Sequence, residues 1–141
     1  ILNQIIHELK EKRMIDEDHI IFINFEFVEF DELLDYKKIN SYVKDKIKDD
    51  KMYYLFLDEV QNVDNFERVV NSLRASLKNI SIFLTGSNSK LLSDELSSVL
   101  SGRYVSFNIN PLSYKEYVLY LPLVSIPVPD CPLFPFEPGM E

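Results

Sequence analysis

Apolar residues recur every three or four positions over the first nine residues of the chain. This spacing predicts an amphipathic helix that ends near Arg13. The apolar positions are Ile1, Leu2, Ile5, Ile6 and Leu9. No capping residue precedes the pattern and the first residue is not Met. We therefore expect the helix to begin upstream and the chain to be an N-terminally truncated piece of a longer protein.

The remaining pattern alternates between strand-like and helical segments. Runs rich in β-branched and aromatic residues predict strands at residues 19–27, 53–57, 80–85 and 104–109. Helical periodicity lies between them, at residues 31–50, 64–77 and 89–100. Asp64 is predicted to cap the second of these helices. The capping box Ser113-x-x-Glu116 predicts a further short helix that ends at about Tyr120.

The strand run from Tyr53 to Leu57 is apolar at every position. A strand without alternation is buried on both faces, as in a parallel sheet covered by helices. Regular alternation of helices and strands indicates βαβ units. The predicted fold class is therefore α/β, a three-layer parallel sheet with helices on both faces, over residues 1–120.

The last 21 residues have a different composition. Residues 121–141 contain six prolines, a density that excludes a helix or a central strand. We expect an extended, Pro-rich tail that is separate from the core. A Pro-rich recognition ligand and an ordinary packed or frayed tail both fit this composition.

Acidic residues outnumber Lys and Arg by 23 to 15, which gives a formal charge of −8. Such a chain has no general attraction for nucleic acid or anionic lipid. Acids interrupt the Lys-rich segment at residues 37–51, which favours a solvated helix face. The single cysteine, Cys131, excludes an internal disulfide and a Cys-based zinc site, and it fits a reducing, cytoplasmic compartment. The longest apolar stretch, residues 117–128, falls short of the roughly 20 residues that span a membrane.

Two acids, Asp58 and Glu59, directly follow the buried strand. Open α/β sheets bind their ligands at the carboxyl ends of the strands. One acid there can hold a Mg²⁺ ion, usually through water, and the next can orient or deprotonate an attacking water. The alternative is a pair of loop acids that face solvent.

The next predicted strand ends in the polar run Thr85-Gly86-Ser87-Asn88-Ser89. Small hydroxyl and amide side chains at a strand end can contact a phosphate or position a water. The alternative is a helix cap after a glycine turn, and both interpretations can hold for different residues of the run. Arg103 precedes the last predicted strand and can reach a phosphate, or it can be a surface residue in a turn.

These motifs, in this order, resemble those of the AAA+-like prokaryotic P-loop ATPases of the AAA_14 type. Residues 55–62 are similar to a Walker B segment, and the similarity continues through residues 82–93, 100–104 and 111–117. The resemblance covers about residues 1–120. It implies a domain that binds ATP and, with Mg²⁺, transfers the phosphoryl group to water. It also implies a homo-oligomer or an appended C-terminal domain.

The resemblance assigns roles to individual residues. Asp58 matches the Walker B acid at Mg²⁺, and Glu59 matches the catalytic glutamate. Arg103 matches an arginine finger, which in such families often acts on the nucleotide of a neighbouring subunit. The sensor-1 residue falls in Ser87-Asn88, with Asn88 preferred. The polar run after the strand thus supplies the nucleotide-contacting residues Thr85, Ser87 and Asn88.

The chain departs from the family pattern in two respects: its Pro-rich tail is unlike the family's continuation after the short helix, and the phosphate-binding loop with its strand is missing. The chain has three glycines, none followed by Lys, and therefore no phosphate-cradling loop of its own. The strand that precedes that loop would lie between the strands predicted at residues 80–85 and 104–109. Enzymatic activity is therefore left open. The alternative is a non-catalytic protein-interaction module derived from a P-loop ATPase.

Overall fold

A computed structural model describes residues 1–86 and 104–120. Contacts between residues divide the chain into two units, Ile1–Tyr104 and Val105–Glu141. Each unit is described by itself. The helix predicted at residues 89–100 and the Pro-rich tail at residues 121–141 lie outside the described residues.

The first unit is built on a sheet of three parallel strands in the order β1-β2-β3. The strands are β1 (Ile20–Asn24), β2 (Tyr53–Asp58) and β3 (Ile80–Leu84). The register places Asn24 beside Asp58 and Leu57 beside Leu84. The parallel arrangement confirms the βαβ units that the alternation of elements predicts.

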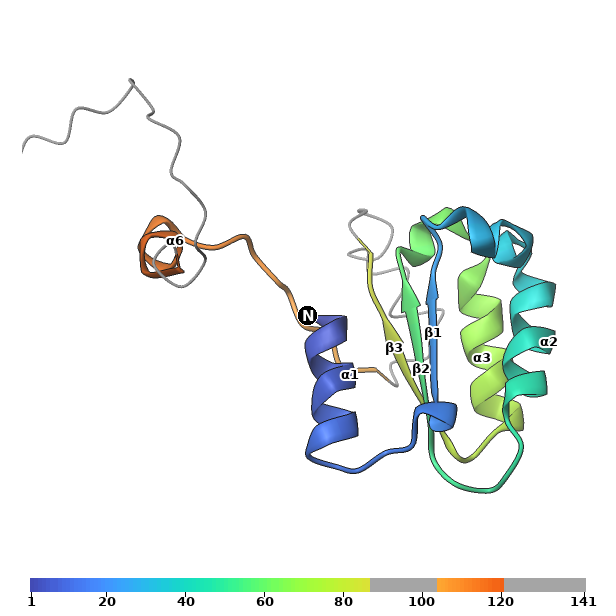
Figure 1. Cartoon of the computed structure of the whole chain (residues 1–141). Coiled ribbons are helices and arrows are strands. Elements are labelled where there is room, and N and C mark those ends of the chain that lie inside the picture. The colour runs from blue at the N-terminus through green and yellow to red at the C-terminus, as the bar shows by residue number, and fades with distance from the viewer. Residues whose placement is uncertain (87–103, 121–141) are drawn as a thin grey trace, which may run out of the picture. The chain divides into compact units, whose positions relative to one another are not determined.

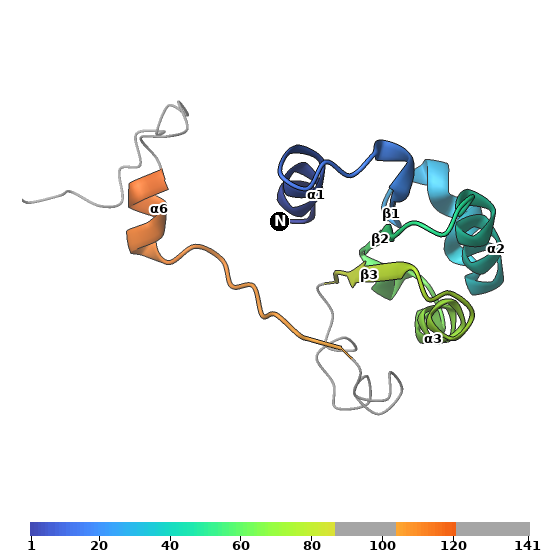
Figure 2. The same cartoon turned by 90° about the horizontal axis from the view of Figure 1, so that it is seen from below.

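Helices cover both faces of this sheet, as Figures 1 and 2 show. Helix α1 (Leu2–Glu11) lies on one face, and α2 (Tyr36–Lys46) and α3 (Phe66–Ser76) lie on the other. The two faces of β2 contribute to two different cores. Leu55 and Leu57 pack with α2 and α3, whereas Phe56 packs with α1 and stacks on Phe83, with 4.7 Å between ring centroids. The non-alternating strand is therefore buried on both faces, and the predicted three-layer fold is confirmed.

Several boundaries differ from the predictions because local hydrogen bonds set them. The helical pattern at residues 31–50 contains a 3₁₀ segment, η2 (Val28–Leu34), and then α2. Helix α2 begins at Tyr36 because the side chain of Asp35 accepts a hydrogen bond from the amide of Lys37 at 2.9 Å. The strand predicted at residues 19–27 is shorter, since η1 (Glu17–His19) precedes it and a turn follows Asn24.

The predicted cap at Asp64 is wrong. The residue that precedes α3 is Asn65, which has φ 57° and no side-chain capping bond. Asp64 is exposed and lies one position too early to bond the first turn. Asn accepts the left-handed conformation more readily than most residues, so the turn before α3 depends on backbone geometry rather than on an acidic cap.

In the second unit, residues 105–113 form neither helix nor strand. The strand predicted at residues 104–109 is therefore wrong. A strand requires a hydrogen-bonded neighbour, and the described residues offer residues 105–109 no backbone partner. The short helix α6 (Tyr114–Tyr120) follows.

The predicted capping box at the start of α6 is confirmed. The carboxylate of Glu116 accepts from the amide of Ser113 at 2.8 Å and from its hydroxyl at 2.6 Å. The amide of Glu116 in turn donates to the Ser113 hydroxyl oxygen at 3.3 Å. Hydrogen bonds from the Ser113 side chain and backbone lower the pKa of Glu116 below its usual value. The two residues thus satisfy amide groups that the first turn of a helix otherwise leaves unpaired.

Candidate functional site

Three polar side chains meet at the carboxyl edge of the sheet, one from the end of each strand. Asn24 ends β1, Asp58 ends β2 and Thr85 follows β3. Asn24 Nδ2 donates to Asp58 Oδ2 at 3.1 Å, and Thr85 Oγ1 donates to Asp58 Oδ1. The carboxylate of Asp58 is therefore held from both sides, and its neighbours come from segments far apart in the sequence.

The amide of Asn24 has a defined orientation. Its Oδ1 accepts from the backbone amide of Glu26 at 2.9 Å, so its Nδ2 faces Asp58. This turn directly after β1 also brings the amide of Phe25 to the carbonyl oxygen of Asp58 at 3.1 Å. The backbone and the side chain of Asp58 are thus both fixed against the end of β1.

Asp58 has the chemistry of a Mg²⁺ ligand. Each carboxylate oxygen accepts one hydrogen bond and keeps further lone-pair capacity. Mg²⁺ prefers hard oxygen ligands and is commonly held by one or two carboxylates together with waters and substrate phosphates. Within residues 1–86 and 104–120, no cluster of three or more His, Cys, Asp or Glu side chains offers a metal cage. The donor set at Asp58 therefore fits Mg²⁺ in its usual mode, with one carboxylate ligand.

Thr85 connects Asp58 to the next acid. Its hydroxyl donates to Asp58, and the same oxygen accepts from the backbone amide of Glu59 at 3.3 Å. Its backbone extends the pairing between the two strands, since Thr85 N–H donates to Leu57 O at 3.0 Å and Thr85 O accepts from Val60 N–H at 3.0 Å. One residue thus fixes the turn in which both acids lie.

Glu59 occupies the left-handed region of backbone space, with φ 56° and ψ 45°. This conformation costs a residue other than glycine roughly 1–2 kcal/mol. Met14 and Asn65 also have positive φ. Strained residues gather at functional sites when the surrounding structure holds them there. The strain at Glu59 therefore favours a role for its side chain.

Gln61 is the nearest polar neighbour of the Glu59 side chain. It lies in the single 3₁₀ turn η3 (Val60–Asn62), and its Nε2 donates to Glu59 Oε2 at 2.5 Å. The other amide atom, Oε1, is buried and has no hydrogen-bond partner within residues 1–86 and 104–120. Gln61 thus binds the carboxylate through its amide donor, while its amide oxygen has no partner in the described part of the chain.

The structure brings together three of the six site residues that the sequence predicts. Asp58 and Thr85 are in contact, and the backbone of Glu59 joins them. The other predicted residues, Ser87, Asn88 and Arg103, lie outside the described residues. Sequence reasoning missed Asn24 and Gln61. Asn24 lay inside the strand predicted at residues 19–27, so no local signal marked it as a strand end. The signal for Gln61 was an amide two positions after Glu59.

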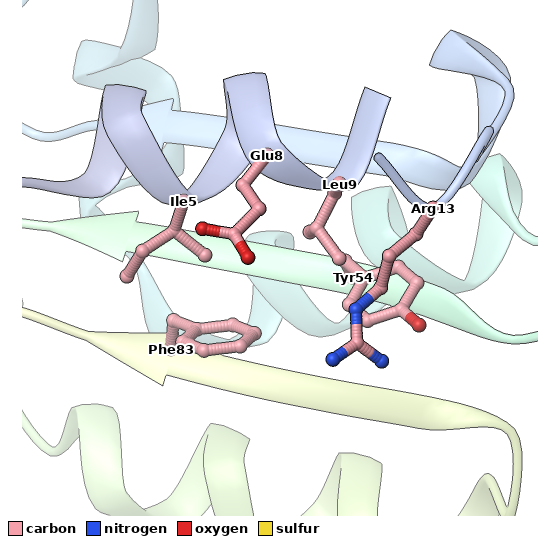
Figure 3. Close-up of a pocket in the computed structure, with 6 residues that line it drawn as sticks. All are labelled: Ile5, Glu8, Leu9, Arg13, Tyr54 and Phe83. Atoms are coloured by element: carbon pink, nitrogen blue, oxygen red, sulfur yellow. The ribbon is translucent and has the colours of Figure 1, made fainter. Parts of the chain in front are cut away.

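A separate pocket of about 380 Å³ lies under α1. Figure 3 shows the side chains of Glu8 and Arg13 reaching from α1 and the turn after it toward Tyr54 and Phe83 of the sheet. Ile5 and Leu9 complete the lining. None of these residues belongs to the predicted site, so the pocket and the polar edge are distinct features.

The parallel sheet, its two helical layers and the polar side chains at its carboxyl edge define an α/β domain of the P-loop type. The family model AAA_14, described as an AAA domain, matches residues 1–118. The chain belongs to this AAA domain family. Within residues 1–86 and 104–120, no helix has the length and apolar character needed to cross a membrane.

Two relatives of the chain bear no functional description. An uncharacterized protein of Haemophilus influenzae is 39% identical over 110 residues, which covers 77% of this chain and 27% of the relative. The uncharacterized protein MJ1544 of Methanocaldococcus jannaschii is 38% identical over 109 residues, which covers 74% of this chain and 23% of the relative. The chain thus spans about a quarter of the length of each. No solved structure gives a significant match.

Proposed function

We propose that this chain supplies the Mg²⁺-holding and water-activating part of an ATP-hydrolysing domain. The observation that carries the proposal is the meeting of Asn24, Asp58 and Thr85 at the carboxyl edge of the sheet, with Glu59 in the adjoining strained turn. Membership of the AAA family supports nucleotide binding. ATP hydrolysis, Mg²⁺ dependence and the roles of single residues go beyond that membership and form the proposal.

Asp58 is the proposed Mg²⁺ residue. Asn24 and Thr85 donate to its two oxygens and keep the carboxylate in one orientation, with the remaining lone pairs available to waters of the metal. When bound there, Mg²⁺ would neutralise the negative charge that develops during phosphoryl transfer. The fixed carboxylate requires no rearrangement when the metal binds, which is the advantage of a preorganised site.

Glu59 is the proposed catalytic residue. Its side chain is partly exposed, and Oε1 accepts no hydrogen bond from the described part of the chain. A carboxylate in this position can accept a proton from, or orient, the water that attacks the terminal phosphate. The adjacent Asp58 would hold the metal, so that one acid serves metal binding and the other serves proton transfer.

The remaining nucleotide contacts extend the proposal to residues outside the described ranges. Ser87 and Asn88 would contact the terminal phosphate, with Asn88 as the sensor. Arg103 would stabilise charge on the phosphate of a neighbouring subunit, which requires a homo-oligomer. We place this activity in the cytoplasm, where ATP is supplied.

The test is hydrolysis by the full-length protein and by its Glu59→Gln variant. We expect the variant to bind Mg²⁺-ATP as tightly as the wild type and to lose at least 100-fold in kcat, in keeping with the loss of a general base. Glu11→Gln is the matched control, because Glu11 is exposed near the end of α1 and its removal changes charge equally. Equal kcat for Glu59→Gln and wild type would refute the proposed role of Glu59.

A further inference from the structure

Resting on the proposed function, we infer that Gln61 is a positioning residue that holds the Glu59 carboxylate in its working orientation. Three observations support this inference: the hydrogen bond between the two side chains, the constraint on the turn that presents Gln61, and the amide oxygen of Gln61, which lacks a partner among the described residues.

The hydrogen bond engages one oxygen of the Glu59 carboxylate. Gln61 Nε2 donates to Glu59 Oε2 at 2.5 Å, while Glu59 Oε1 accepts from no described residue. An ionised carboxylate only accepts hydrogen bonds, so the donor end of the Gln61 amide must face it. One oxygen of Glu59 is thereby fixed, and the other is left for a proton from water.

The turn that presents Gln61 is tightly held. Val60 is fully buried, and its amide donates to the carbonyl of Thr85 at 3.0 Å. The side chain of Asn62 donates to the carbonyl of Phe25 at 3.4 Å, which ties the same turn to the segment after β1. Gln61 lies between these two anchored residues. A donor on such a turn can restrict a neighbouring side chain in a way that a solvated side chain cannot.

The amide oxygen of Gln61 distinguishes a positioning role from a structural one. Oε1 is buried and has no partner among the described residues. A buried acceptor without a partner loses its hydration without compensation, so this oxygen by itself does not stabilise the fold. Replacing the amide with an apolar group of similar length removes this unpaired atom. The fold should therefore tolerate the replacement, while the carboxylate of Glu59 loses its restraint.

The experiment compares Gln61→Met and Gln61→Glu with wild type in the full-length protein. Methionine has similar length and no donor, and glutamate has the same shape but cannot donate to a carboxylate when ionised. We expect kcat for ATP hydrolysis to fall about 10- to 100-fold in both variants, the size of effect that small misplacement of a catalytic group produces. KM for Mg²⁺-ATP should stay within twofold of wild type. The urea midpoint of Gln61→Met should equal or exceed that of wild type.

A double-mutant cycle with Glu59→Gln separates positioning from other effects. If Gln61 acts through Glu59, Gln61→Met should not lower the residual rate of Glu59→Gln any further. Gln4→Met is the control for loss of a glutamine amide, because Gln4 is exposed on α1. It should leave kcat unchanged.

The outcomes distinguish this inference from the proposed function. If Glu59→Gln lowers kcat but Gln61→Met and Gln61→Glu do not, the role of Gln61 is refuted and the proposed function stands. If the Gln61 variants lower the urea midpoint and raise KM while kcat is retained, Gln61 is structural and the inference fails. If Glu59→Gln itself retains full kcat, the proposed function fails, and Gln61 has no catalytic group to position.

Discussion

Replacing Thr85 with valine isolates the hydroxyl that connects the two acids. Valine keeps the shape and β-branching of threonine, and the backbone bonds of residue 85 to Leu57 and Val60 do not involve the side chain. The substitution removes the Thr85 hydroxyl, which donates to Asp58 and accepts from the amide of Glu59. A hydrogen bond to a charged group is worth about 1.5–3 kcal/mol. Because Asp58 and Thr85 are partly exposed and water can replace the hydroxyl, we expect the lower end of that range.

The prediction is therefore a fall of about 1.5 kcal/mol in the free energy of unfolding for Thr85→Val. Urea denaturation measures this quantity, and Thr85→Ser, which keeps the hydroxyl, should lose much less. A loss of this size in the hydrolytic transition state corresponds to about a tenfold fall in kcat. If Thr85→Val matched wild type in both stability and rate, the bridging role of the hydroxyl would be wrong. If Thr85→Ser lost as much as Thr85→Val, the γ-methyl of Thr85 would contribute as much as its hydroxyl, and the hydroxyl would not be the group that dominates at this position.

Three further predictions concern the fold. Phe56→Ala should lower the free energy of unfolding by about 3–5 kcal/mol, because this side chain is fully buried between the sheet and α1. Urea denaturation measures this change. In the same assay the control Phe27→Ala, at a half-exposed position, should change the free energy of unfolding by under about 0.5 kcal/mol. Met14→Gly should raise the thermal unfolding midpoint by several degrees, because Met14 is exposed and has φ 53°. Glycine adopts this conformation without the strain of about 1 kcal/mol that methionine carries. An unchanged or lower midpoint would contradict this prediction. The capping box of α6 should weaken as pH falls, because the pKa of Glu116 in the folded chain lies below its usual value of 4.5. The Glu116 carboxylate stabilises the helix fully above pH 4.5. This stabilisation is lost as the pH falls through the lowered pKa of the folded state. Amide chemical shifts at residues 114–117 measure this loss, and Ser113→Ala should abolish the pH dependence.

The candidate site was partly predictable from the sequence because parallel strands end at one edge of their sheet. A buried apolar run followed by Asp58, and a second strand followed by Thr85, were enough to predict that both residues lie at strand ends, and the structure shows that they are in contact. Asn24 was hidden within a predicted strand. Only the register, which pairs Asn24 with Asp58, shows that this strand ends at the same edge. Register depends on contacts between distant segments, and no local pattern contains it.

The conformation of Glu59 was also beyond the sequence. Nothing in the residue type predicts φ 56°, because glutamate normally avoids the left-handed region. The hydrogen bonds from Glu59 N–H and Val60 N–H to Thr85 impose it, since they pull the chain after β2 across the end of β3. The orientation of the Glu59 side chain toward Gln61 follows from the same turn.

The sequence by itself determined the features that depend on neighbouring residues. These are the amphipathic spacing of α1, the two-sided burial of β2, the capping box of α6 and the order of elements that produces a parallel α/β sheet. Each rests on a repeat of two or 3.6 residues or on a bond spanning three residues. The tertiary structure alone decided which strands pair, where each strand ends and which side chains share the carboxyl edge. Residues 104–109 show the difference, because their composition favours a strand but a strand forms only when another backbone satisfies its hydrogen bonds.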